Sequence, residues 1–242
     1  MRIVVLSDVH GNLAALEAVL SAVGSIDAIW HLGDAVGYGP QPQAVVDRLR
    51  AAGAIWVRGN HDDAGGGGKS IDLFNPDGYL AMKWTRANID EPTRKYLAEL
   101  PELAKPESMS VTLAHGSPSN PIWEYMNSAA VANRNLPYFE TQFCLVGHTH
   151  VAMAFRETHG VMHMVPVTSR TRLRFGDKRA ILNPGSVGQP RDGDSRASYM
   201  VVDTGSAYVA WHRAEYDIEA TQTAMAEAGL PHNLARRLSV GR

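Results

Sequence analysis

The sequence contains one cysteine, Cys144, among its 242 residues, so it cannot form an internal disulfide framework. It also lacks any apolar run near the ~20 residues that a membrane-spanning helix needs. The formal net charge is -2 at pH 7 and there is no basic block, so nothing indicates a nucleic-acid polymer or a membrane as partner. No signal-peptide pattern precedes Arg2. We therefore expect a soluble protein of the reducing cytoplasm.

The first sixty residues alternate between strand-like and helix-like segments. Short apolar runs rich in β-branched residues predict the strands, and apolar residues at helical spacing predict the helices, with Asn12 as an N-cap. In chain order these segments are strand 2–7, helix 12–23, strand 26–32, helix 41–50 and strand 54–57. This alternation is typical of a mostly parallel sheet with helical crossovers.

The rest of the chain follows a different pattern. Four consecutive glycines at 65–68 predict a mobile loop that enters a helical excursion at about 64–100, with a helix-prone stretch over about 78–100. Residues 117–140 indicate a long irregular connection, and such connections are often functional. The other predicted segments are strands 110–114, 143–146, 151–156, 161–167, 179–182, 198–202 and 207–211, and helices 218–228 and 233–238. No repeat or boundary interrupts them, so we expect a single domain over residues 1–242.

Five predicted strands end in short polar motifs. In an open α/β sheet the carboxyl ends of the strands face one crevice where ligands bind, so residues far apart in sequence can meet there. The motifs are Asp8-Val9-His10, Gly33-Asp34, Gly59-Asn60-His61-Asp62, His115-Gly116 and Gly147-His148-Thr149-His150.

The side chains in these motifs are of the kinds that bind transition metals. They offer oxygen and nitrogen donors and no thiolate, which suits Mn, Fe, Co, Ni or Zn better than Ca or Mg. Apart from Asp62, the motifs offer two aspartates, one asparagine and five histidines, which are too many for one ion and about right for two. The neighbouring glycines let the backbone bend and approach closely.

This ordered set of motifs resembles the calcineurin-like metallophosphoesterase superfamily. The opening Asp8-Val9-His10-Gly11-Asn12 and the later Asn183-Pro184-Gly185-Ser186-Val187 resemble its small prokaryotic phosphodiesterase branch. The motifs span residues 8–150, and the later element extends the match to about 191. The resemblance implies an α/β fold, a four-layer αββα sandwich of two mixed β-sheets flanked by helices, with the active site at one edge.

The resemblance also implies a role for each motif residue. The implied ligands are Asp8, His10 and His150 for the first metal, Asn60, His115 and His148 for the second, and Asp34 for both, with one oxygen on each ion. A hydroxide between the two ions would attack phosphorus in line with the leaving group. His61 would bind no metal and would protonate the leaving alkoxide or stabilise the phosphoryl charge, with Asp62 orienting it.

Several residues have a second interpretation. Asp62 could equally cap the segment that follows it, and Asn60 could be a turn residue. The stretch from Asn183 to Ser186 could be a tight turn, or it could contribute to substrate binding together with Arg191, whose guanidinium can hold a phosphate oxygen. The following residues are expected to be structural or solvated: His31, His159, His163, His212, His232, Cys144, Arg170, Arg172, Arg174, Lys178 and Arg179.

These observations predict a two-metal-dependent phosphodiesterase that hydrolyses a small phosphate ester, with nucleotides among the candidate substrates. Manganese is the first expected metal, with Fe, Zn, Ni or Co as alternatives. The alternative functions are a phosphomonoesterase or nucleotidase, a dinucleoside polyphosphate hydrolase, and a non-catalytic interaction scaffold on the same fold. The presence of His61 and of every implied ligand favours an enzyme over a scaffold.

Overall fold

The computed structural model describes residues 1–242 except the side chain of Ser70. Its strands form two mixed sheets of six strands each. The first sheet runs in the order β3 (Ile55–Trp56), β2 (Ala28–His31), β1 (Arg2–Leu6), β11 (Ala197–Asp203), β12 (Tyr208–Ala214), β9 (Arg172–Arg174). The second runs in the order β4 (Leu103–Ala104), β5 (Val111–Ala114), β6 (Phe143–Leu145), β10 (Ala180–Pro184), β7 (Ala152–Thr158), β8 (Val161–Val165).

Strand β1 shows why the sheets stack face to face. Successive side chains of a strand point to opposite faces. Ile3 and Val5 pack into the core between the two sheets, whereas Val4 and Leu6 pack into a second core under the helices. Because both faces are covered, residues 3–6 of the strand are all apolar rather than alternating. It pairs in parallel with β2 and antiparallel with β11, which makes the sheet mixed as predicted.

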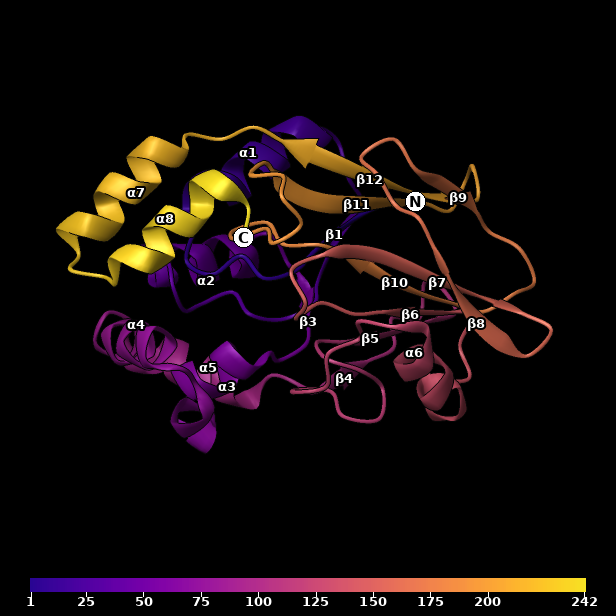
Figure 1. The fold of residues 1–242 in the computed structure, drawn as a ribbon, viewed down its shortest axis with the longest axis horizontal. Helices are drawn as coiled ribbons and strands as arrows, with labels where there is room; N and C mark the ends of the chain where they lie inside the picture. Colours follow the sequence, from indigo (N-terminus) through magenta and orange to yellow (C-terminus); the bar gives the residue numbers. More distant parts are fainter.

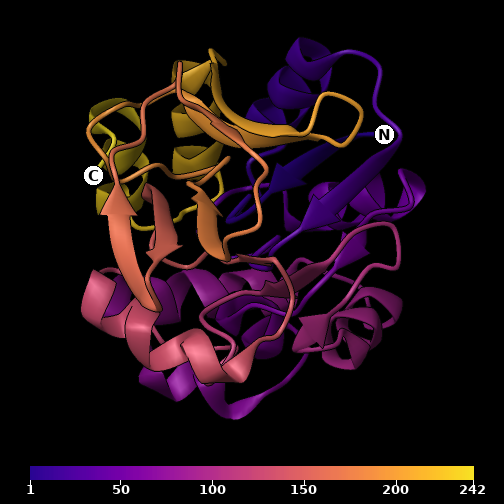
Figure 2. The same cartoon turned by 90° about the vertical axis from the view of Figure 1, so that its right-hand side faces the viewer.

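Helices cover the outer face of each sheet and complete the predicted four layers. Helices α1 (Leu13–Val23) and α2 (Pro42–Ala51) pack on the first sheet. Helix α6 (Ala129–Asn135) packs on the second, and Figure 2 shows it alongside β7 and β8. The Asn12 side chain accepts a hydrogen bond from the Ala15 N–H at 3.1 Å, which confirms it as the N-cap of α1. The αββα sandwich is therefore confirmed.

The segment 64–100 holds more elements than expected. Helix α3 (Asn60–Gly65) and the 3-10 helix η1 (Lys69–Leu73) precede α4 (Pro76–Ala87) and α5 (Glu91–Glu99). The helix-prone stretch predicted over 78–100 forms two helices, because the Asp90 side chain caps a new helix through the Thr93 N–H at 2.8 Å. Pro92 in its first turn has no N–H to continue α4.

The glycine run lies close against α5. A Cβ atom at Gly66 would lie 2.7 Å from the backbone nitrogen of Ala98, so only glycine fits at this contact. Gly66 therefore allows two backbone segments to approach each other, a role that the loop prediction did not include.

Residues 117–140 also contain regular structure, so the prediction of a wholly irregular connection is wrong. Helix α6 begins after Ser128, whose hydroxyl accepts a hydrogen bond from the Val131 N–H, and a 3-10 helix, η2 (Leu136–Tyr138), follows it. At the end of the chain, α7 (Ile218–Glu227) and α8 (His232–Val240) pack side by side at one end of the molecule, remote from β8 and β9 (Figure 1). No helix in the described part of the chain is long and apolar enough to span a membrane.

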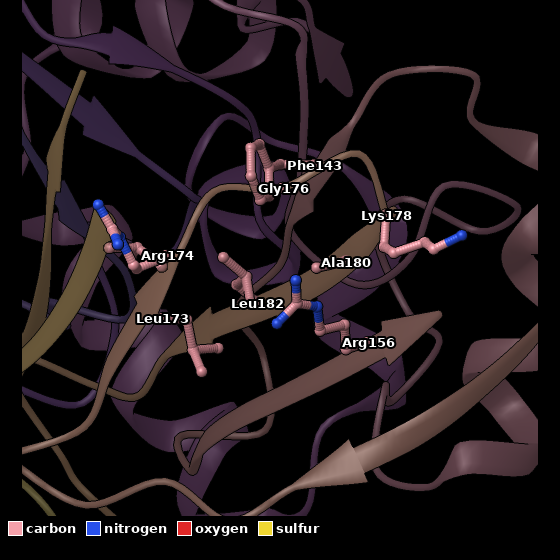
Figure 3. Close-up of a pocket in the computed structure, with 9 residues that line it drawn as sticks. Phe143, Arg156, Leu173, Arg174, Gly176, Lys178, Ala180 and Leu182 are labelled. Atoms are coloured by element: carbon pink, nitrogen blue, oxygen red, sulfur yellow. The ribbon is translucent and has the colours of Figure 1, made fainter. Parts of the chain in front are cut away.

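A small cavity lies between the sheets near the start of β10 (Figure 3). Leu173 and Leu182 belong to its apolar lining, and Arg156, Arg174 and Lys178 stand around it. Its volume of about 10 Å³ has room for a single water. Arg174 and Lys178 are exposed, as expected for a solvated face. The polar strand-end motifs lie beyond the opposite end of β10, so this cavity is separate from them.

Candidate metal centre

The loops that follow five strands are joined to one another by backbone hydrogen bonds. The Asp8 N–H donates to the Gly33 carbonyl and the His10 N–H to the Asp34 carbonyl, both at 3.0 Å. The Gly147 N–H donates to the His115 carbonyl at 2.8 Å, which links the ends of β5 and β6. These bonds join loops within each sheet, and the His148 N–H, which donates to Asp8 Oδ2 at 3.1 Å, joins the loops of the two sheets at one edge of the sandwich.

One cluster of donor atoms comes from the ends of β1 and β6. The Nε2 atoms of His10 and His150 lie 3.1 Å apart, and Asp8 Oδ1 lies 3.8 and 3.3 Å from them. All three side chains are buried. Asp8 Oδ2 accepts from the Ser7 hydroxyl, while the buried Oδ1 has no hydrogen-bond partner among the described atoms. A cation among these three atoms would satisfy that oxygen, so the cluster fits a metal ion.

A second cluster lies beside the first. His115 Nε2 is 3.0 Å from His148 Nδ1 and 3.1 Å from the side-chain oxygen of Asn60. Asp34 Oδ2 is 3.3 Å from the same His115 nitrogen. Four donor atoms therefore converge within the reach of one ion, and the set is again nitrogen and oxygen without sulfur.

Asp34 connects the two clusters through one oxygen. Its Oδ2 faces His115 in the second cluster and, at 3.8 Å, His10 Nε2 in the first. Its Oδ1 accepts a hydrogen bond from the His61 N–H at 2.8 Å. The expectation of one carboxylate oxygen for each ion therefore does not match this geometry, because Oδ1 is occupied by the backbone and Oδ2 faces both clusters.

Backbone carbonyls hold the imidazoles in a defined orientation. The Nδ1 atoms of three histidines lie within hydrogen-bond distance of carbonyl oxygens: His10 with Val36 at 3.0 Å, His115 with Leu32 at 2.8 Å and His150 with Gln189 at 2.6 Å. A neutral ring that donates from Nδ1 carries its lone pair on Nε2, which is the atom that faces the clusters. This arrangement is the usual outer support of histidine metal ligands.

The backbone at the clusters is unusual. Five of the seven implied ligands have positive φ angles of 49° to 64°, and they are Asp8, His10, Asp34, His148 and His150. Residues other than glycine rarely occupy this left-handed region, although Asn, Asp and His are enriched there. Such strained conformations concentrate at functional sites.

Burial and charge shift the pKa values of these groups. Burial lowers the pKa of His10 to about 4 and that of His148 to about 3, so both rings are neutral at physiological pH. Burial also raises the pKa of Asp8 to about 7. Burial lowers the pKa of His115 as well, but the adjacent Asp34 carboxylate outweighs it and raises the value to about 9. His10 and His148 therefore have the neutral form that a cation needs, whereas His115 would have to lose a proton when a cation binds.

His61 lies at the edge of the first cluster. Donor atoms of His61, His10 and Asp34 lie within 4.8 Å of one another. Its Nδ1 is 3.2 Å from the sulfur of Met82, and its ring contacts those of His10 and Tyr38. The structure therefore brings His61 to the same edge of the sandwich as the predicted ligands.

Asp62 does not orient His61. Its carboxylate accepts hydrogen bonds from the backbone N–H groups of Asp34 at 2.8 Å, Ala35 at 2.9 Å and Gly59 at 3.2 Å. No hydrogen bond joins it to the His61 ring among the described contacts. The implied orienting role is therefore not supported, and the capping alternative is the one that the contacts fit.

The element from Asn183 to Ser186 supports the two loops of the first cluster. The Asn183 amide donates to the Gly147 carbonyl at 2.7 Å, and the Ser186 hydroxyl donates to the Asp8 carbonyl at 2.8 Å. The structural interpretation of this element therefore holds. Arg191, in contrast, lies near the clusters, with its guanidinium 5.9 Å from the Tyr38 ring and donating to the Gln189 side chain at 2.9 Å.

Sequence reasoning missed the aromatic side chains around the clusters. Tyr38 contacts the rings of His10 and His61, and Phe74 contacts His61. Trp123 and Tyr125 contact His148. Two signals could have indicated them: Tyr38 stands between two glycines after Asp34, and the tryptophan and tyrosine lie in the connection that was expected to be functional.

The remaining histidines have the structural surroundings that were expected. His31 is buried, accepts from the Gly33 N–H at 3.3 Å and packs edge-on against Trp56. His212 stacks on Tyr199. Cys144 is fully buried in the core, where burial raises the pKa of its thiol.

Comparisons with known proteins identify the family. A family model described as a calcineurin-like phosphoesterase superfamily domain matches residues 1–207. An uncharacterized protein of Methanocaldococcus jannaschii is 35% identical over 245 residues, covering 99% of this chain and 98% of the relative. The chain therefore belongs to the calcineurin-like phosphoesterase superfamily.

Two further comparisons place the chain within this superfamily. A metallophosphoesterase from Sphaerobacter thermophilus has a solved structure that is 46% identical, with a TM-score of 0.90 and coverage of 100% of this chain and 99% of that chain. Phosphodiesterase YfcE of Escherichia coli is 27% identical over 217 residues, covering 84% of this chain and 88% of the relative. The expected small prokaryotic branch is confirmed.

Proposed function

We propose that the protein is a two-metal-dependent phosphoesterase whose preferred substrate is a phosphodiester. The observation that carries the proposal is the position of Asp34 Oδ2, a single carboxylate oxygen that faces two adjacent sets of donor atoms. The relationship to a protein named as a phosphodiesterase supports the diester.

The donor atoms divide between two ions. Asp8, His10 and His150 would hold one ion and Asn60, His115 and His148 the other, with Asp34 shared. When bound, two divalent ions supply the Lewis acidity that activates water and neutralises charge on a phosphate. Manganese is our first candidate, and the same donor set suits Fe, Zn, Ni or Co.

The side chains around the ions act on the substrate. His61 would donate a proton to the oxygen of the leaving group, because its ring lies beside His10 and Asp34 and its Nδ1 faces the sulfur of Met82. Asp62 would act indirectly by holding the backbone of the Asp34 loop. Arg191 would hold a phosphate oxygen.

We also propose that residues 1–242 form one domain. Helices α7 and α8, which follow the segment matched by the family model, pack against Tyr38 and Ala81 in a shared apolar cluster. Because Tyr38 contacts His10 and His61, the end of the chain supports the site.

The test is hydrolysis of bis(p-nitrophenyl) phosphate by protein loaded with Mn²⁺, before and after Asp34→Asn. The amide oxygen can still accept from the His61 N–H, so the fold is retained while the charge shared by both clusters is lost. We expect turnover to fall at least about 100-fold and metal content to fall below two per chain by elemental analysis. The exposed Asp177→Asn serves as the matched control and should change neither value.

Two outcomes would contradict parts of the proposal. Faster hydrolysis of p-nitrophenyl phosphate than of the diester would favour a phosphomonoesterase. Two bound metals without turnover of any ester, across Mn, Fe, Zn, Ni and Co, would favour the non-catalytic scaffold.

A further inference from the structure

Three aromatic side chains lie along one edge of the metal centre. Phe74 lies 4.4 Å from the His61 ring and 5.9 Å from Trp123, measured between ring centroids. Trp123 lies edge-on to His148 at 6.2 Å, and Tyr125 stacks on the same imidazole at 4.0 Å and 19°. We call Phe74, Trp123 and Tyr125 the aromatic arc.

The arc comes from two separate segments and is not part of a sealed core. Phe74 follows η1, and Trp123 and Tyr125 precede α6. Trp123 is half-buried, and Tyr125 is 48% exposed although one side of its ring lies on His148. A single exposed aromatic residue needs no explanation, but three rings beside the candidate metal centre form a surface suited to a ligand.

The position of the arc indicates which part of a substrate would contact it. A phosphate at the metal centre would lie between Arg191, which is near Tyr38, and the arc, which touches His61 and His148. The groups esterified to that phosphate would then extend over the arc. Aromatic faces bind planar rings by stacking, and every nucleobase offers such a face.

We propose that the aromatic arc binds a nucleobase of the substrate, so that the protein prefers phosphodiesters of nucleosides to those of alkyl alcohols. This inference rests on the proposed function, because the metal centre provides the site for the phosphate. Tyr125 and Trp123 are then specificity residues, and their contribution is to ground-state binding of the base.

The test compares two ligands that share a phosphate and a ribose and differ only in the base. The affinities of AMP and ribose 5-phosphate for the Mn²⁺-loaded protein are measured by titration calorimetry. Base–aromatic stacking is worth about 5- to 150-fold in affinity, so AMP should bind at least about fivefold more tightly. Tyr125→Ala should reduce this preference while the affinity for ribose 5-phosphate stays unchanged, and Tyr125→Phe should retain it.

Tyr138→Ala is the matched control. Tyr138 is a tyrosine of η2 that is 62% exposed and contacts no residue of the arc among the described ring contacts. The variant should keep the full preference for AMP. Trp123→Ala should lower the preference further when combined with Tyr125→Ala, because the two rings contact the same histidine.

The result that overturns the inference is distinct from failure of the proposed function. Equal affinities for AMP and ribose 5-phosphate in the unmodified protein would refute base binding, even with normal hydrolysis of bis(p-nitrophenyl) phosphate. If the preference for AMP survives in Tyr125→Ala and in the double variant with Trp123→Ala, the assignment of base binding to the aromatic arc is refuted. An AMP preference that is lost in these variants, in a protein that hydrolyses no ester, would support the arc and refute the phosphoesterase proposal.

Discussion

His61 offers the sharpest test of how the centre divides metal binding from proton transfer. The perturbation is His61→Ala. Its backbone N–H, which donates to Asp34 Oδ1 at 2.8 Å, remains after the substitution. The imidazole, which is 2% exposed and packs against Tyr38 and Phe74, is removed. The variant therefore keeps the backbone support of the shared ligand and loses only the ring.

The expected magnitude follows from the role of the ring. Proton donation to a leaving group by a positioned side chain contributes typically ~10²–10⁴-fold to the rate. This corresponds to about 3–5 kcal/mol of transition-state stabilisation. A nitrophenolate leaves without needing a proton, so the loss should be much smaller for nitrophenyl esters than for alkyl esters.

The assay measures kcat for an alkyl diester and for bis(p-nitrophenyl) phosphate, together with metal content by elemental analysis. We expect two metals per chain in the variant, a large loss on the alkyl ester and a small loss on the nitrophenyl ester. The exposed His163→Ala in β8 should change none of these values. Loss of one metal would show that His61 is a ligand, and full activity on the alkyl ester would show that it is not the acid.

Three further predictions concern the whole fold. Chelation of the bound metal should lower the unfolding temperature by roughly 10 °C, and adding Mn²⁺ should restore it. The reason is that a metal present at ~1,000 times its Kd stabilises the folded state by about 4 kcal/mol. An unchanged unfolding temperature would exclude bound metal. Gly188→Ala should lower the free energy of unfolding, measured in urea, by about 1–3 kcal/mol, because the added Cβ would meet the Val9 carbonyl oxygen. Gly205→Ala should leave it unchanged, because the nearest atom to a Cβ there lies at 3.4 Å. Buried Cys144 should react with a thiol reagent only after unfolding, and rapid labelling of the native protein would contradict its burial.

The regular parts of the fold could be predicted because their signals are local. The apolar run of β1 and the N-cap of α1 are both contained in a few consecutive residues. Strands β4 and β9 have two and three residues and no period of their own. They are strands only because β5 and β12 pair with them, and pairing across distant segments cannot be seen in a short window.

The candidate site likewise has a part that could be predicted from the sequence and a part that could not. Its motifs could be predicted because polar residues at strand ends are recognisable in the sequence, and topology brings such ends together. The contacts of Asp62 could not be predicted, since its carboxylate binds the Asp34 loop 28 residues away rather than the neighbouring His61. The arc was missed because Phe74 and Trp123 meet only after two distant loops fold over the sheets.

The left-handed backbone at the ligands explains why the element from Asn183 to Ser186 was ambiguous in the sequence. Glycine occupies positive φ without strain but has no side chain that could bind a metal. The aspartate at position 8 therefore adopts a φ of 53° in spite of the strain that its side chain causes. A strained residue of this kind persists only when its surroundings fix it. The carbonyl of Asp8 accepts from the Ser186 hydroxyl at 2.8 Å and from the Gly188 N–H at 3.0 Å. The element therefore holds the backbone of a proposed metal ligand, so its turn-like composition and the supporting role that we propose for it have the same physical cause.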